Sequence, residues 1–159
     1  SVVGSAIEHP GHIGFVAIVS SLADAASVYS PAGVTAAVVE APAMLSMLSL
    51  PWPMLGTEQI ESFLGIGEVV FSSLYLAASR VHGLGAKRTS LALCGGFVLT
   101  LFALLLFEQA IPALPFLGAA VVLAHPETRR PAAVDRLRGL VGIALLSLVL
   151  SAWMLLPHC

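Results

Sequence analysis

Charged residues are scarce in this chain. Of its 159 residues only 10% are charged, whereas 58% are hydrophobic, and the mean hydropathy is +0.97. A soluble domain of this size is usually about one quarter charged. Apolar surface in this amount can be accommodated only in lipid. The composition therefore predicts an integral membrane protein whose first partner is the lipid bilayer.

Basic residues, cysteines and several enzyme motifs are also few or missing. Seven Lys and Arg residues against nine Asp and Glu give a net charge of −2, so the basic footprint of a nucleic-acid-binding protein is lacking. The two cysteines, Cys94 and Cys159, form no disulfide framework. The sequence contains neither HExxH nor a GxSG nucleophile motif, which disfavours a zinc site and a rhomboid-type serine site. No signal peptide is evident at the N-terminus.

Long apolar runs dominate what is present. About 20 helical residues are needed to cross roughly 30 Å of hydrocarbon, and four or five segments approach this length. The expected spans are 11–29, 60–81, 90–107, a short one at 111–125, and 139–156. The segment 33–55 is interrupted by prolines, which cannot continue a helix, and it is predicted to be a broken or interfacial helix. We therefore expect an all-α, polytopic transmembrane bundle that forms a single domain over residues 1–159.

Basic residues occur in two loops only. The loops at 80–88 and 126–138 hold all the Lys and Arg residues, whereas those at 30–59 and 108–111 hold none. Counting the spans places both basic loops on one side of the membrane. The positive-inside rule then predicts that this is the cytoplasmic side or its equivalent.

Two acids, Asp24 and Glu68, lie inside expected spans and away from their ends. An ionisable group at such depth is costly and indicates function by default. Asp24 lies five residues before the end of its span at Tyr29, and Glu68 lies eight residues after the start of the next span at Ile60. At about 1.5 Å per residue the depths are roughly 8 and 12 Å, so the carboxyls of neighbouring helices can meet. Two such carboxyls share a proton, and this is the chemistry of an aspartic protease.

The surroundings of the two acids agree with a substrate site. Gly65 and Gly67 permit close backbone approach and local unwinding, which would admit an extended substrate. Pro112, Ala113 and Leu114 begin a segment on the same side of the membrane as both acids. The sequence thus predicts that three features converge at one membrane level.

A structural role for the acids stays open beside the catalytic one. Glu68 would then be a buried acid that is bonded to Ser72, four residues further along the helix. Asp24 would be bonded in the same way to a nearby serine: Ser20, Ser21 or Ser27.

Three segments, taken in order, resemble one known family. They are ADAASVYSPAGVTAAVVEAPAML from residue 23, FLGIGEVVFSSLYLAA from residue 63, and LALCGGFVLTLFALLLFEQAIPALPF from residue 91. Residues 20–125 resemble the C-terminal half of presenilin and signal peptide peptidase, the GxGD-type intramembrane aspartyl proteases. The resemblance implies that Asp24 is the first catalytic acid, that Glu68 occupies the place of the second, and that residues 112–114 match the PAL motif at the substrate cleft.

The chain also departs from the family pattern. Glu68 stands where the family has Asp, and Ala23 stands where it has Tyr. Five preceding helices and most of a hydrophilic loop have no counterpart. One hypothesis is therefore a presenilin-like protease that cleaves transmembrane helices and needs no metal or organic cofactor. The alternative is a catalytically inactive structural subunit of a larger membrane complex, with another chain supplying the missing helices. A small transporter that uses the acids as a proton relay is a third interpretation.

Overall fold

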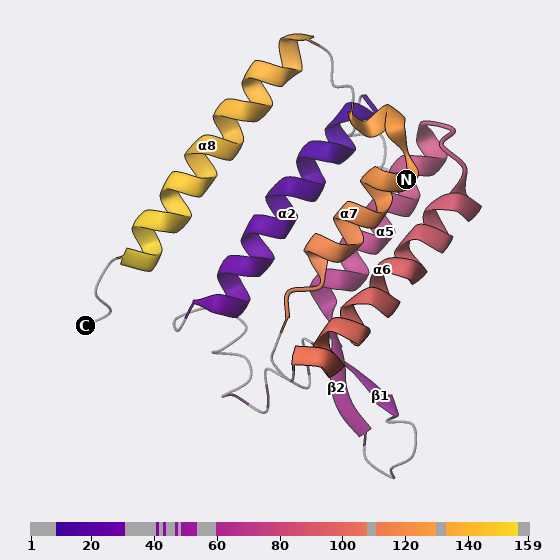
Figure 1. The fold of residues 1–159 in the computed structure, drawn as a ribbon, viewed down its shortest axis with the longest axis vertical. Coiled ribbons are helices and arrows are strands. Elements are labelled where there is room, and N and C mark those ends of the chain that lie inside the picture. Colours follow the sequence, from indigo (N-terminus) through magenta and orange to yellow (C-terminus); the bar gives the residue numbers. More distant parts are fainter. Residues whose placement is uncertain are drawn as a thin grey trace.

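The computed structural model describes residues 9–30, 49–53, 60–107, 111–129 and 133–155, together with the single residues 41, 43 and 47. Within these ranges the chain is mainly helical, as predicted (Figure 1). The α-helices are α2 (Gly11–Tyr29), α5 (Ile66–Val81), α6 (Ala86–Phe107), α7 (Leu114–Ala124) and α8 (Ala133–Leu155). A short 3-10 helix, η1 (Pro126–Arg129), follows α7.

In the described part of the chain, two helices are long and apolar enough to cross a membrane, namely α2 and α6. Helix α2 has the same bounds as the expected span, and α6 begins four residues before the expected start at residue 90. Helix α7 and the part of α8 at Gly139–Ala152 are shorter apolar helices.

A β-hairpin occupies a part of the chain that was expected to be helical. Strand β1 (Ser49–Pro53) pairs in antiparallel fashion with β2 (Ile60–Gly65). The prediction of helix was therefore wrong for 60–65, and also for 49–53 within the segment 33–55. Pro51 and Pro53 explain part of the difference, because proline is tolerated at the free edge of a strand but not inside a helix. The rest of segment 33–55 lies outside the described residues, apart from residues 41, 43 and 47.

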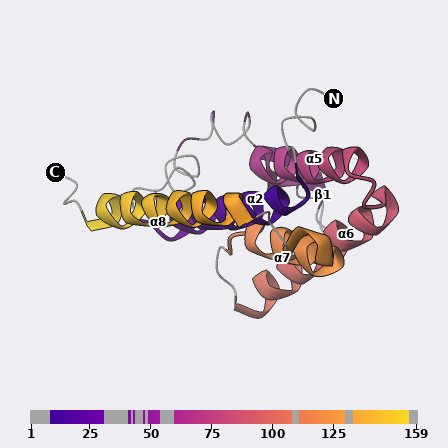
Figure 2. The ribbon, with the colours of Figure 1, turned by 90° about the horizontal axis from the view of Figure 1, so that it is seen from above.

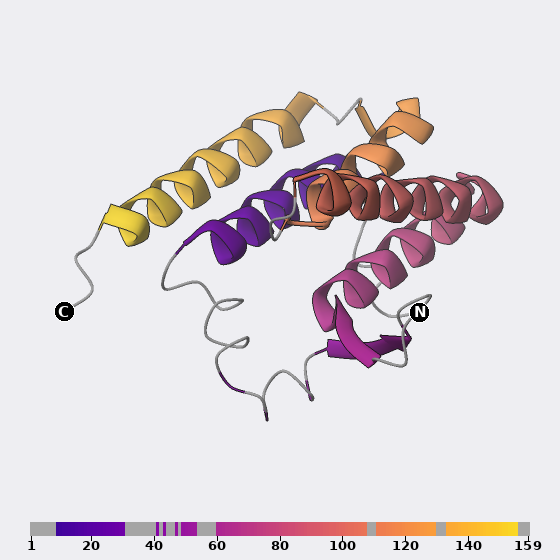
Figure 3. The same ribbon diagram turned by 60° about the horizontal axis from the view of Figure 1, so that its bottom comes forward.

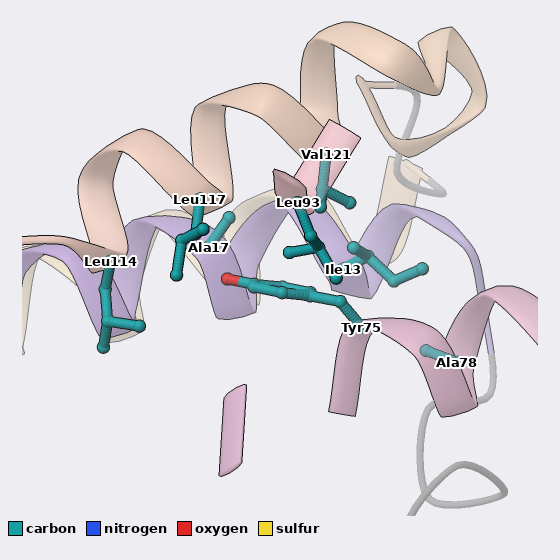
Figure 4. Close-up of a cluster of buried hydrophobic side chains, with 8 residues drawn as sticks. All are labelled: Ile13, Ala17, Tyr75, Ala78, Leu93, Leu114, Leu117 and Val121. Atoms are coloured by element: carbon teal, nitrogen blue, oxygen red, sulfur yellow. The ribbon is translucent and has the colours of Figure 1, made fainter. Parts of the chain in front are cut away.

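Helix α7 lies at the centre of the packing, in contact with α2, α5 and α6, whereas α8 lies beside α2 at the edge of the molecule (Figures 2 and 3). The buried core comes from the four inner helices, and the Tyr75 ring lies across its middle (Figure 4). Its members are Ile13 and Ala17 of α2, Tyr75 and Ala78 of α5, Leu93 of α6, and Leu114, Leu117 and Val121 of α7.

Small residues set the spacing of the inner helices. A Cβ added at Gly118 of α7 would lie 3.0 Å from the Cβ of Ala17 on α2. Likewise, a Cβ at Gly96 of α6 would lie 3.0 Å from a methyl group of Leu117. Side chains without bulk at these positions let the backbones of adjacent helices approach closely.

Large apolar side chains cover the outside of α6 and α8. Leu91 and Leu105 of α6 are 75% and 76% exposed, and Leu148 of α8 is 67% exposed. A soluble monomer rarely exposes many large apolar side chains on one helix, whereas hydrocarbon accommodates them. The outer surface therefore has the character of a surface that faces lipid.

The basic residues of the described chain gather at one end of the molecule. Thr89, near the start of α6, bonds to His125, which follows α7, and the charge of Arg88 acts on His125. Helix α2 begins at this same end, since a Cβ at Gly14 would lie 2.8 Å from the carbonyl oxygen of Thr128 in η1. The described parts of the two basic loops thus lie at the same end of the molecule.

Candidate functional site

Asp24 bonds directly to the segment that begins α7. Its Oδ2 atom accepts a hydrogen bond of 2.9 Å from the backbone N–H of Leu114, which is 90 residues away in the sequence. The N–H of Ala113 also interacts with this carboxyl group. The first N–H groups of a helix have no partner within the helix, and the N-cap residue Ala113 provides no side-chain bond. Asp24 therefore caps α7 from a different helix.

The residues of the PAL match consequently lie beside Asp24. Leu114 and Pro112 are buried, and Ala113 is half-buried. Pro115 sits in the first turn of α7, where proline is accommodated because no intrahelical donor is needed. The sequence prediction had placed these residues and Asp24 at one membrane level, and the structure brings them into contact.

Glu68 lies in the first turn of α5 and turns back over the start of its own helix. The N-cap of α5 is Gly65, and the backbone N–H groups of Gly65 and Glu68 bond to the Glu68 carboxyl. A Cβ added at Gly65 would lie only 2.5 Å from Oε2 of Glu68. An acid at the third helical position that reaches back to the N-cap N–H is one half of a capping box. The absence of a side chain at Gly65 thus makes room for the carboxyl.

The depth expected for Glu68 needs correction, because the helix begins at Ile66 and not at Ile60. Glu68 is the third residue of α5, since residues 60–65 belong to the hairpin. At this position it faces the positive end of the helix dipole, which favours an acid. A Cβ at Gly65 would clash with the Glu68 carboxyl, whereas a Cβ at Gly67 would meet nothing within 4 Å. The close approach expected at both glycines is therefore present at Gly65 but not at Gly67.

The two carboxyl groups remain within electrostatic range of each other in spite of this correction. Asp24 is close enough for its charge to act on Glu68. Both acids are half-buried, and each uses backbone amides at the start of a helix. The arrangement fixes the direction of both carboxyls and keeps them on adjacent helices.

The bonds that the structural alternative would use are not made by Ser72, Ser20 or Ser21. The Ser72 hydroxyl is buried and has no hydrogen-bond partner within the described chain. Ser20 and Ser21 both donate to the carbonyl oxygen of Ala17. Both acids bond to backbone N–H groups at the start of a helix, and this capping is itself a structural role.

Tyr75 is a residue near the site that the sequence analysis missed. Its side chain is 1% exposed, and its hydroxyl lies 3.3 Å from that of Ser20 on α2. In Figure 4 the hydroxyl points toward the end of the core where Leu114 and Leu117 lie. The signal was available, because Tyr75 follows Glu68 by seven residues and so shares its helix face.

The described part of the chain has no cluster of potential metal ligands. Among the residues that the structure describes, no group of three His, Cys, Asp or Glu side chains is placed to hold a metal ion.

Comparison with known proteins finds no similar protein. No family model, curated protein or solved structure matches the chain. The functional conclusion therefore rests on this chain's own residues and their geometry.

Proposed function

We propose that this chain is a multi-pass membrane protein of presenilin-like type, in which Asp24 and Glu68 form the carboxyl pair of an intramembrane aspartyl protease. The observation that carries the proposal is the bond between Asp24 and the Leu114 N–H. It joins the first acid to the PAL match, and the second acid lies within reach of the first acid's charge. The substrates are single transmembrane helices that unwind at the scissile bond.

In the proposed reaction the pair holds one proton between its two carboxyls. The ionised carboxyl takes a proton from a water molecule, and the water oxygen attacks the scissile carbonyl carbon. The protonated carboxyl gives its proton to the carbonyl oxygen, which produces a neutral tetrahedral intermediate. When the C–N bond breaks, the protonated carboxyl gives a proton to the leaving amine, and the ionised carboxyl takes one from a hydroxyl group of the intermediate, so that the carbonyl forms again and the pair again holds one proton. The Leu114 N–H keeps the Asp24 carboxyl in a fixed direction during these steps.

The proposed membrane orientation follows from charge. The described cations Arg80, Lys87, Arg88 and Arg129 belong to the two basic loops, which meet at the end of the molecule opposite the carboxyl pair. By the positive-inside rule this end is cytoplasmic. With this orientation the helices run as in signal peptide peptidase, and the preferred substrates have a cytoplasmic N-terminus.

A substitution that keeps the cap but removes the acid tests the proposal. Glutamine serves as well as glutamate in a capping box, so Glu68→Gln is expected to preserve the fold while cleavage of a helical substrate in detergent falls at least about 100-fold. Glu68→Asp is expected to cleave, because it keeps the carboxyl. Unchanged cleavage by Glu68→Gln would exclude Glu68 as a catalytic residue.

The second candidate is an inactive presenilin-like subunit of a larger membrane complex. The observation that favours it is the Glu68 carboxyl itself, which is bonded over Gly65 at the start of its own helix. In this case the native chain cleaves no helical substrate, whereas Glu68→Asp gains cleavage because the shorter side chain releases the cap. A stoichiometric partner that copurifies from the native membrane would support this candidate, and a chain that is folded and active alone would contradict it.

A further inference from the structure

An open apolar groove runs along the outside of α2 and α7, apart from the carboxyl pair. Its volume is about 480 Å³. The floor is formed where Ala17 and Gly118 bring the two helices together, and a cation, Arg129, stands at one end. The apolar walls are formed by Phe15, Ile18 and Leu22 of α2 and by Pro115 and Val122 of α7.

The groove opens toward the outside of the molecule. Ile18 is 45% exposed, and Ala119, which also lines the groove, is exposed. Neither Asp24 nor Glu68 belongs to the lining. The groove is therefore a second feature, separate from the proposed catalytic pair.

Arg129 is held in place at the end of the groove. Its Nε donates to the carbonyl oxygen of Val122 at 3.1 Å, and its Nη2 donates to that of Leu123 at 3.2 Å. A guanidinium has five N–H donors, and these two bonds use two of them. The nearby acid Glu127 lines a different hollow, together with His9, Pro10 and Pro126. Among the described residues that line it, the groove thus combines a long apolar part with one fixed and exposed positive charge, that of Arg129.

We propose that this groove binds an anionic phospholipid, with an acyl chain lying along α2 and α7 and the phosphate on Arg129. The proposal rests on the membrane placement given above. The volume is in the range of about 300–1,000 Å³ that is usual for small-ligand sites, whereas a protein partner would need about 800 Å² of contact on each side. Arg129, the charged side chain among the described lining residues, matches one anionic headgroup above one apolar chain. The cytoplasmic leaflet, where the basic end is placed, is the leaflet rich in anionic lipids.

Native mass spectrometry of the full chain tests the proposal. The protein is released from nanodiscs that contain equal amounts of phosphatidylglycerol and phosphatidylcholine, and the retained lipids are counted. We expect phosphatidylglycerol to be preferred, and Arg129→Gln to lower that preference about fivefold. Ala119→Phe fills the groove from an exposed position and is expected to reduce the retention of both lipids. The matched control, Lys87→Gln, removes a cation from the same end of the molecule but outside the lining, and should leave retention unchanged.

Four outcomes would overturn the proposal. The first is equal retention of the two lipids by the native chain. The second is a preference that Arg129→Gln leaves intact, because the site would then be absent. The third is a preference that free inorganic phosphate abolishes, because the site would then be specific for phosphate alone. The fourth is a fall in oligomeric mass with Ala119→Phe, because a second copy of the chain would then be the occupant. Cleavage plays no part in the measurement, so a failure of the protease proposal is seen separately, in the Glu68 variants.

Discussion

At the scale of single residues, both acids use the unpaired amides at the beginning of a helix. Asp24 accepts the N–H of Leu114 from across the α2–α7 contact, and Glu68 accepts the N–H of Gly65 within its own segment. A carboxylate at this position is stabilised by the positive end of the helix dipole. The same bonds that stabilise the helices also orient the two carboxyls, so a structural and a catalytic role do not exclude each other.

The cap that Asp24 provides can be tested by its removal. Asp24→Ala leaves the Leu114 N–H without its acceptor, and a hydrogen bond to a charged group contributes about 1.5–3 kcal/mol. Asp24→Asn keeps an acceptor oxygen at the same place. We therefore expect a clear fall in the melting temperature for Asp24→Ala, and a much smaller fall for Asp24→Asn, in matched detergent samples. Equal losses for the two variants would mean that the charge, and not the cap, stabilises the fold.

At the scale of helices and strands, the closest contact between α2 and α7 depends on one glycine. Gly118→Val would place two methyl groups against Ala17, whose Cβ already lies 3.0 Å from the Cβ position. Overpacking of this kind typically costs about 1–3 kcal/mol, and it would push the Asp24 carboxyl away from Leu114. The loss is measured as a lower melting temperature in detergent.

Gly95 of α6 offers the matched control for this prediction. A Cβ at Gly95 would meet nothing within 4 Å, so Gly95→Val changes helix propensity without a clash. Its cost is expected to stay below about 0.5 kcal/mol, because glycine is itself a poor helix former. If the two variants are equally stable, the α2–α7 contact is not tight at Gly118.

The helices could be predicted from the sequence because their signal is local. The apolar run that ends at Tyr29 has the same bounds in the structure, and Ser30 follows it in an extended conformation. The hairpin could not be predicted in the same way. Three of the residues 60–64 are apolar, and this composition fits a strand as well as a helix. The strand is selected by pairing with β1, in which Ser62 lies opposite Pro51, eleven residues earlier in the sequence.

The candidate site was predictable in part for the same reason. A PAL sequence and two acids inside apolar runs can be seen in the sequence, and the structure places Asp24 against Leu114. The capping by Glu68 was missed because it depends on where α5 begins, and that boundary depends on the hairpin. The spacing of Gly65 and Glu68, an N-cap residue with an acid three residues later, was the local signal for it. The bond between Ser20 and Tyr75 joins residues that are 55 positions apart. A local sequence pattern cannot predict such a pair.

At the scale of the whole molecule, His125 joins the two basic loops. Its Nε2 lies 2.9 Å from the hydroxyl of Thr89, while its Nδ1 is buried without a hydrogen-bond partner among the described residues. His125 lies beyond the end of α7 at Ala124. Burial lowers the pKa of His125 from its usual 6.5, the charge of Arg88 lowers it further, and the charge of Glu127 acts in the opposite direction.

This pKa shift predicts a loss of stability in mild acid. Below about pH 6.5 the unfolded chain binds a proton at His125 while the folded chain resists it, so the free energy of unfolding falls as the pH decreases. The loss begins near pH 6.5 and ends below the pKa of the folded state. Melting temperatures between pH 7.5 and 5 should therefore decrease in the native chain and change less in His125→Gln. His82→Gln, in the turn after α5, is the control and should keep the full dependence, whereas a flat profile in the native chain would contradict the prediction.

The 90-residue separation between Asp24 and Leu114 has a consequence for biosynthesis. In a chain that enters the membrane while it is being translated, α2 arrives first and its carboxyl must wait until α7 has been made. During this interval Asp24 has no amide to bind, and an unpaired acid in hydrocarbon is unfavourable. Nascent chains that stop before residue 111 should therefore hold α2 less firmly in the bilayer than chains that include α7. The proposed catalytic centre is thus assembled only after the ribosome has produced α7.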